Sequence, residues 1–81
     1  MKYYRSERFD RSFKKLSFRI KKVFYKQLNF LLKDLKHPSL RAKKYDEATG
    51  VWQARVTQNV RFYFVIDKDS YFLVDIKKHK D

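Results

Sequence analysis

The sequence contains no cysteine, a single glycine and a single proline among its 81 residues. Without cysteine the chain has neither a disulfide framework nor a thiolate metal site, and a reducing compartment is expected. One glycine excludes a glycine-rich phosphate-binding loop, and with one proline it leaves no flexible linker. The fold must therefore rest on packed side chains, and eight Phe, six Tyr and one Trp are available for that purpose.

Long apolar runs are also missing. The longest covers the five residues Phe62–Ile66, whereas a membrane span needs about 20 residues. The first ten residues lack the continuous apolar stretch of a signal peptide. We therefore expect one small domain over residues 1–81, located in the cytoplasm and not in a membrane.

Acidic residues are scarce, because 9 Asp+Glu stand against 21 Lys+Arg and give a net charge of +12. Residues 1–45 hold 15 of the basic residues and three of the acids, while residues 46–81 hold six of each sign. Such a basic half favours a polyanionic partner: nucleic acid, an anionic membrane surface or an acidic protein segment. The alternative is that these side chains merely solvate exposed faces.

The N-terminal half predicts a strand at residues 1–9, with Tyr4 and Phe9 inward, and then two helices. Asp10 is the candidate cap of a short helix, and Ser17 caps a longer one that runs to about Leu35. Apolar residues follow one side of the longer helix at a spacing of three or four residues, and they are Ile20, Phe24, Leu28, Leu31 and Leu35. A basic ridge lies opposite: Lys15, Arg19, Lys22, Lys26 and Lys33.

Three or four strands follow Pro38, which ends the helix. The candidate strands are Leu40–Tyr45, Val51–Val56, Val60–Asp67 and Tyr71–Lys78. Short segments rich in Asp, Asn, Thr, Ser and Gly join them and predict an antiparallel meander. The expected fold is α+β, with an N-terminal strand and two helices packed on one face of a mainly antiparallel four- to five-stranded sheet.

Alternation along these strands divides apolar from polar residues. The expected core face carries Leu40, Ala42, Trp52, Ala54, Val56, Val60, Phe62, Phe64, Ile66, Phe72, Val74 and Ile76. The opposite face then presents Arg41, Lys43, Tyr45, Gln53, Arg55, Arg61, Tyr63, Asp75, Lys77 and His79. Cations interleaved with tyrosines suit RNA, because arginine pairs with phosphate and unstacked bases stack on aromatic rings.

RNA cleavage is the chemistry that this face best accommodates, since the nucleophile is the substrate's own 2′-OH. The protein must supply cations for the phosphorane charge, a proton acceptor and a proton donor. Arg55 and Arg61 are candidate cations, His79 is a candidate acid or base, and Asp75 is placed to orient it. Two distant histidines without convergent carboxylates argue against a metal site, and no cofactor is expected.

Five short motifs follow one another along nearly the whole chain. They are Phe13-Lys14-Lys15-Leu16, then His37-Pro38-Ser39-Leu40-Arg41 with Lys43-Lys44, Gly50-Val51-Trp52-Gln53-Ala54-Arg55-Val56, Val60-Arg61-Phe62-Tyr63-Phe64, and His79. In this order and spacing the chain resembles the RelE/ParE toxins of type II toxin–antitoxin systems.

The resemblance implies a compact β-α-α-β-β-β(-β) fold, a cognate antitoxin that forms an oligomer with the toxin, and, in the RelE branch, cleavage of mRNA on the ribosome. It implies that Arg61 is a catalytic residue that stabilises the phosphate. It also implies that Arg55 is the cation that the family keeps on the preceding strand, and that His79 is the acid/base histidine of YoeB-like members. Gln53 stands where RelE has a lysine. The expected RNA-binding residues are Arg41, Lys43, Lys44, Gln53, Tyr63, Lys77, Lys15, Arg19, Lys22 and Lys26.

One departure from this pattern is the segment 36–39, which has no carboxylate where YoeB-like enzymes place a general base. The sequence predicts a toxin that acts as a ribosome-dependent mRNA endonuclease. Two alternatives stay open. A ParE-like inhibitor of DNA gyrase needs no acid/base pair, and a non-catalytic relative would only bind RNA or an acidic partner.

Overall fold

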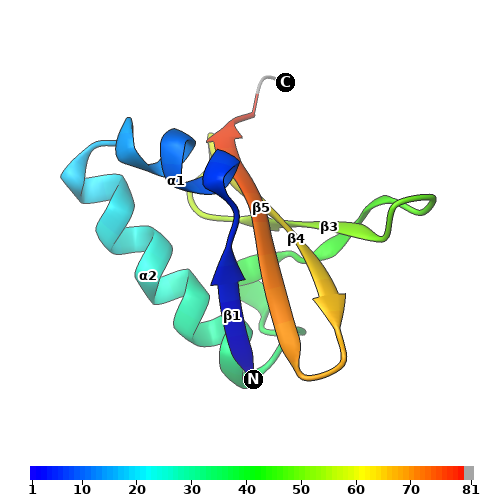
Figure 1. The fold of residues 1–81 in the computed structure, drawn as a ribbon. Coiled ribbons are helices and arrows are strands. Elements are labelled where there is room, and N and C mark those ends of the chain that lie inside the picture. Colours follow the sequence, from blue (N-terminus) through cyan, green and yellow to red (C-terminus); the bar gives the residue numbers. More distant parts are fainter. Residues whose placement is uncertain (80–81) are drawn as a thin grey trace.

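A computed structural model describes residues 1–79 as a five-stranded sheet with two α-helices and one short 3₁₀ helix (Figure 1). In chain order the elements are β1 (Lys2–Arg5), α1 (Glu7–Lys14), α2 (Phe18–Lys33), η1 (Pro38–Leu40), β2 (Lys43–Asp46), β3 (Val51–Arg55), β4 (Val60–Asp67) and β5 (Ser70–Lys78). The strand order is β1-β5-β4-β3-β2. Among the strands of residues 1–79 only β1 runs parallel to its neighbour, so the predicted α+β fold with a C-terminal antiparallel meander is confirmed.

Helix α1 begins earlier than the sequence predicted, and the first strand is shorter. Ser6, not Asp10, is the N-cap, because its Oγ accepts a hydrogen bond from the Phe9 amide at 3.0 Å. The predicted strand at residues 1–9 therefore ends at Arg5. Phe9 is fully buried as expected, but it is buried from a helix. Tyr4 was expected inward and is half exposed on the edge strand.

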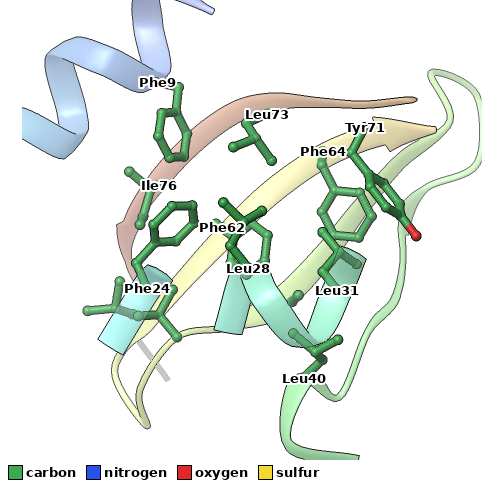
Figure 2. Packing of buried hydrophobic residues seen from close by; sticks show 13 residues of the cluster. Phe9, Phe24, Leu28, Leu31, Leu40, Phe62, Phe64, Tyr71, Leu73 and Ile76 are labelled. Atoms are coloured by element: carbon green, nitrogen blue, oxygen red, sulfur yellow. The ribbon is translucent and has the colours of Figure 1, made fainter. Parts of the chain in front are cut away.

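Helix α2 has the predicted cap and the predicted buried stripe. The Ser17 Oγ accepts from the Ile20 amide at 3.2 Å. Phe24, Leu28 and Leu31 are buried against the sheet, where they join Phe62 and other strand residues in one core (Figure 2). Within residues 1–79, neither helix combines the length and the apolarity that crossing a membrane requires.

The segment after α2 differs from the predicted strand at residues 40–45. Pro38 opens the 3₁₀ helix η1, and β2 starts only at Lys43. Proline at the first position of a helical turn is favoured, because its φ is already correct and its missing N–H is not needed there. Leu40 is buried as expected. Arg41 ends η1 in the left-handed conformation, with φ 46° and ψ 44°.

Strand β5 contains a bulge that overturns two predicted core positions. Tyr63 of β4 pairs with Asp75, but the next residue, Phe64, pairs with Leu73, so β5 holds one extra residue between them. Before the bulge Tyr71 and Leu73 face the core, not Phe72 and Val74 as predicted. Phe72 is 40% exposed and stacks on Tyr4 of β1, with ring centroids 5.2 Å apart. Beyond the bulge Ile76 is buried, as expected.

Candidate functional site

The sheet face that α2 leaves uncovered gathers cations from neighbouring strands. Arg55 of β3 lies opposite Arg61 of β4, and Arg61 lies opposite Lys77 of β5. Two residues further along the same face, Gln53, Tyr63 and Asp75 form a second row. The strand parity predicted from the sequence is therefore correct for this part of the sheet.

An open hollow at the β3–β4 end of this face has an arginine-rich lining. We refer to it as the arginine hollow, and its residues are Arg41, Lys43, Gln53, Arg55 and Arg61. None of these five side chains forms an ion pair with a carboxylate anywhere in residues 1–79. Four cations without acidic partners make a strongly positive site.

The positive charge of the arginine hollow has its clearest effect on Arg55. Its Nε is buried and has no hydrogen-bond partner among the described residues. Desolvation, followed by repulsion from Arg41 and Arg61, lowers the pKa of its guanidinium. Buried donors normally find acceptors, and an unpaired one at a functional site calls for an explanation. An anion in the arginine hollow would supply both the missing acceptor and the missing negative charge.

Arg61 is held in place by the turn between β3 and β4. Its Nη1 donates to the carbonyl of Thr57 at 2.6 Å, of Gln58 at 2.9 Å and of Val60 at 3.3 Å. Nε and Nη2 make no hydrogen bond within residues 1–79. A guanidinium anchored through one nitrogen keeps its remaining donors for a ligand in a fixed direction.

Gln27 connects three elements beneath the arginine hollow, and the sequence prediction missed it. The side chain is 5% exposed, and its Nε2 donates to the carbonyl of Arg55 at 2.8 Å and of Ser39 at 3.0 Å. Its Oε1 accepts from the Ser39 hydroxyl at 3.1 Å. Gln27 thus holds β3 and η1 at fixed positions under Arg55 and Arg41. The signal in the sequence was a single amide side chain, Gln27, between Phe24 and Leu28 on the apolar stripe of α2.

Beside the arginine hollow the open face continues into a second hollow of about 180 Å³. We refer to it as the tyrosine hollow, and its lining residues are Arg8, Tyr45, Asp46, Thr49, Val51, Tyr63, Val74, Asp75 and Lys77. Tyr63, a predicted RNA-binding residue, is 5% exposed. Burial and then the neighbouring Tyr45 raise the pKa of its hydroxyl. Tyr63 and Lys77 both line this hollow, and the Lys77 Nζ sits 5.3 Å from the Tyr63 ring centroid.

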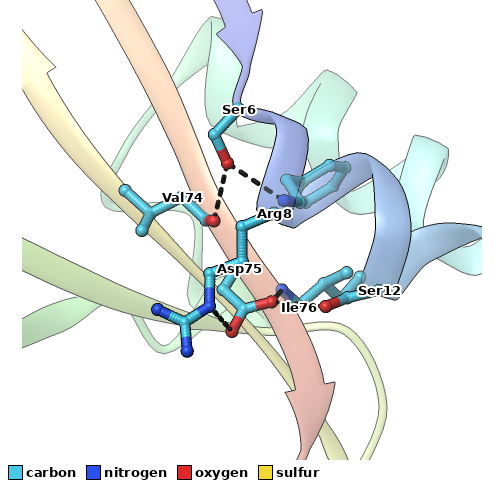
Figure 3. Close-up of polar contacts among 7 residues, drawn as sticks. Ser6, Arg8, Ser12, Val74, Asp75 and Ile76 are labelled. Atoms are coloured by element: carbon cyan, nitrogen blue, oxygen red, sulfur yellow. Dashed lines mark hydrogen bonds and ion pairs between the residues drawn. The ribbon is translucent and has the colours of Figure 1, made fainter.

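Asp75 joins the open face to helix α1 (Figure 3). Its Oδ1 accepts from the Ser12 hydroxyl at 2.7 Å and from the Ile76 amide at 2.9 Å. The Arg8 Nε lies 3.5 Å from Oδ2. Arg8 and Ser12 are four residues apart and therefore share one side of α1. The carboxylate expected from the sequence to orient His79 is thus engaged by α1 and by its own strand.

His79 lies directly beyond β5 and next to the turn that Arg61 caps. Its backbone amide donates to the Asn59 carbonyl at 2.7 Å, and its side chain is half-buried. The structure therefore brings Arg55, Arg61 and the His79 backbone to the same end of the sheet. Whether these residues act in catalysis stays a prediction.

Several predicted RNA-binding residues lie away from the arginine hollow. The Lys44 Nζ sits 5.5 Å from the Trp52 ring centroid and 3.8 Å from Glu47, outside the hollow's lining. The ridge residues are exposed, with Lys15 as the C-cap of α1 and Arg19, Lys22 and Lys26 on α2. Because α2 turns Phe24 and Leu28 toward the sheet, Lys22 and Lys26 face away from it. The ridge and the arginine hollow are thus separate surfaces.

No protein-family model matches the chain, and no curated protein matches it either. Solved structures do match, over nearly the whole chain. The YoeB/ParE toxin from Agrobacterium tumefaciens superimposes with a TM-score of 0.82 at 12% identity, covering 99% of this chain and 100% of that one. The YoeB dimer from Staphylococcus aureus gives 0.82 at 14% identity, covering 99% and 98%.

A structure from an archaeon has the same fold. The RelE–RelB complex from Pyrococcus horikoshii contains a chain that superimposes with a TM-score of 0.78 at 10% identity, covering 95% of this chain and 92% of that one. At such identities the likeness establishes the fold. The compact α+β domain that the five motifs implied is confirmed, and this chain has the fold of the YoeB, ParE and RelE toxins.

Proposed function

We propose that this chain is the toxin of a type II toxin–antitoxin system and cleaves mRNA on the ribosome. The observation that carries the proposal is the arginine hollow, in which Arg41, Lys43, Arg55 and Arg61 converge without an acidic partner within residues 1–79. Its place on a fold shared with YoeB and RelE toxins supports the same function. The setting is the cytoplasm, where ribosomes and mRNA meet.

In the proposed reaction the 2′-OH of one nucleotide attacks the adjacent phosphorus, and the bond from phosphorus to the 5′ oxygen of the next nucleotide breaks. The products are a 2′,3′-cyclic phosphate and a free 5′-OH. The proton leaves the 2′ oxygen, and a proton is delivered to the departing 5′ oxygen. No metal ion is needed for this sequence, because the substrate supplies its own nucleophile.

The three predicted catalytic residues divide these tasks. Arg55 and Arg61 stabilise the negative charge that develops on the phosphorane oxygens, in the way that preorganised donors stabilise other oxyanions. The unpartnered Nε of Arg55 and the fixed guanidinium of Arg61 suit this role. His79 transfers one of the two protons. The second proton transfer falls to a group on the ribosome or to water.

An acidic protein partner follows from the charge. A net charge of +12 on 81 residues, with an exposed ridge on α2 and the arginine hollow behind it, favours a partner that covers cations. The archaeal structure is a RelE–RelB complex. We propose that a cognate antitoxin binds this chain and forms an oligomer with it.

The test is expression of the chain from a tight promoter, followed by mapping of mRNA 5′ ends. Wild type is expected to produce new 5′ ends inside translated codons. Loss of a catalytic arginine should lower the cleavage rate about 10²–10³-fold. Arg55→Gln is the preferred variant, since no hydrogen bond of the Arg55 side chain is present in residues 1–79, whereas Arg61→Ala also removes three bonds to a turn.

Arg11→Gln on α1 is the matched control, because it removes one exposed arginine that lines neither hollow and is not a predicted RNA-binding residue. It should leave the pattern of 5′ ends unchanged. Growth arrest without new 5′ ends, accompanied by DNA-damage signalling, would replace the proposal with gyrase inhibition. No growth arrest from the wild-type chain would leave a binding function only.

A further inference from the structure

The tyrosine hollow lies one step along the sheet from the arginine hollow, on the same face. Arg61 and Tyr63 are two residues apart on β4, and Lys77 and Asp75 are two residues apart on β5. Two residues of a strand span about 6.6 Å. A ligand with a phosphate at the arginines can therefore reach the tyrosines, since in a nucleotide the next group outward is the sugar with its base.

The walls of the tyrosine hollow suit a flat ring. Tyr45 is 58% exposed, and its ring meets Tyr63 edge to face, with centroids 5.0 Å apart and an interplanar angle of 65°. This contact with a buried residue fixes the orientation of Tyr45 before any ligand binds. An exposed ring held in one position is a stacking platform with little conformational entropy left to lose.

The opposite wall carries hydrogen-bonding groups of both kinds. Asp75 uses Oδ1 for Ser12 and for its own strand, whereas Oδ2 has only the Arg8 Nε, at 3.5 Å, among the residues described. A carboxylate oxygen has room for a further donor. Arg8 and Lys77 are the donors at the same wall. A ring edge that presents an N–H next to a hydrogen-bond acceptor fits this wall of the tyrosine hollow.

We propose that the tyrosine hollow binds a nucleobase that carries an amino group, from the same RNA strand whose phosphate occupies the arginine hollow. The base stacks on Tyr45, and its amino group donates to Asp75. Uracil fits less well, because its N–H lies between two carbonyl oxygens that the carboxylate repels. This inference rests on the proposed function in taking the strand to be RNA and its phosphate to lie in the arginine hollow.

The probes are tetranucleotides of 2′-O-methyl RNA, in which the blocked 2′ oxygen prevents cleavage. All positions are uridine except one, which is guanosine, cytidine, uridine or abasic. Dissociation constants are measured at fixed low salt by fluorescence anisotropy. For wild type we expect guanosine and cytidine to bind more tightly than uridine, and uridine more tightly than the abasic probe.

Tyr45→Leu should weaken binding of the guanosine probe roughly 5- to 100-fold, the range of one lost stacking contact. It should leave the abasic probe within about twofold of wild type. Tyr3→Leu is the matched control, since Tyr3 is 38% exposed on β1 and does not line either hollow. Asp75→Asn should remove the preference for guanosine and cytidine over uridine. If Asp75→Asn loosens α1, Tyr45→Leu still decides the question.

Equal binding of the base-bearing and abasic probes to wild type would overturn the inference, and so would a Tyr45→Leu loss as large for the abasic probe as for the others. The proposed function has a separate readout in these measurements. Arg55→Gln should weaken all four probes by the same factor. If it weakens none of them, the phosphate site of the proposed function is wrong, whatever Tyr45→Leu shows.

Discussion

Arg41 has a left-handed backbone conformation, which glycine adopts without strain and which an arginine rarely adopts. Its φ of 46° lies in the left-handed region, where a side chain costs about 1–2 kcal/mol per residue. Strained residues of this kind cluster at binding and catalytic sites, where the surrounding structure holds them. Here the strain places a guanidinium at the rim of the arginine hollow, directly after η1.

Comparing two truncations separates the strain from the charge. Arg41→Gly should be more stable than Arg41→Ala by about 0.5–1 kcal/mol, because relief of strain outweighs the extra flexibility of glycine in the unfolded chain. Both variants should weaken tetranucleotide binding to the same degree, since both lose the cation. Urea unfolding and anisotropy titrations give the two quantities. Equal stability of the two variants would show that residue 41 does not keep this conformation in solution.

Tyr71 makes the stability of the fold sensitive to alkaline pH. Burial, followed by the nearby Asp34, raises the pKa of its hydroxyl above the ordinary value of 10.0. The native state therefore keeps a proton that the unfolded chain has lost, so this contribution is present below about pH 10 and disappears as pH rises through the native pKa.

Tyr71→Phe should consequently lose less stability than wild type between about pH 8 and about pH 10.5. Urea unfolding at both pH values measures the difference. Contributions that wild type and variant share cancel in this comparison. Tyr3→Phe, at a more exposed tyrosine, serves as the control. A Tyr71→Phe profile parallel to wild type would contradict the assignment.

Among the elements, α2, η1 and β3 depend on one side chain for their mutual position. Gln27→Leu would leave the carbonyls of Arg55 and Ser39 without their donor, although leucine fills a similar volume. Loss of a buried partner costs about 1–3 kcal/mol. We expect Gln27→Leu to lower the free energy of unfolding by about 2 kcal/mol.

The same variant should also weaken tetranucleotide binding, because Arg41 and Arg55 are no longer held at a fixed separation. Asn29→Leu, two residues along α2 and exposed, is the matched control and should change stability by less than about 0.5 kcal/mol. A Gln27→Leu protein that loses stability but binds the tetranucleotide as tightly as wild type would show that the hydrogen bonds of Gln27 serve the fold alone.

Elements with local signals could be predicted from the sequence. The cap at Ser17 and the apolar stripe behind it predict α2, and the turn residues around Val60–Asp67 predict both ends of β4. The start of α1 was predicted wrongly, because Asp10 was taken as the cap and the structure has Ser6. A tertiary contact favours Ser6, whose hydroxyl donates to the Val74 carbonyl of β5 at 2.8 Å.

Features that depend on pairing between distant residues were not accessible in this way. The bulge in β5 adds one residue between Leu73 and Asp75, and no residue type in that strand marks it. In the site, the adjacency of Arg55 and Arg61 could be predicted, because a hairpin and simple alternation determine it. The hydrogen bond from Gln27 to the Arg55 carbonyl could not be predicted, because the two residues are 28 positions apart in the sequence.

At the scale of the whole molecule, the net charge of +12 has opposite effects on stability and on binding. Like charges on a body of 31 × 27 × 25 Å repel one another, and salt screens that repulsion. The melting temperature of the free chain should therefore rise with salt. The affinity for RNA should fall, because salt opposes the release of counterions on binding.

The slope of log RNA affinity against log salt distinguishes a localised phosphate site from general attraction to a basic protein. For a single strand, each phosphate contact adds about 0.7 to the slope of log affinity against log salt. Arg55→Gln should therefore flatten the slope for the uridine tetranucleotide by about 0.7. Lys22→Gln, on the far side of the sheet, should leave it unchanged, since so short a strand at the arginine hollow does not reach the outer face of α2. Equal flattening by the two variants would contradict a localised phosphate site. It would mean that the strand binds the positive potential of the whole molecule, and the arginine hollow would be only the place where this potential is strongest.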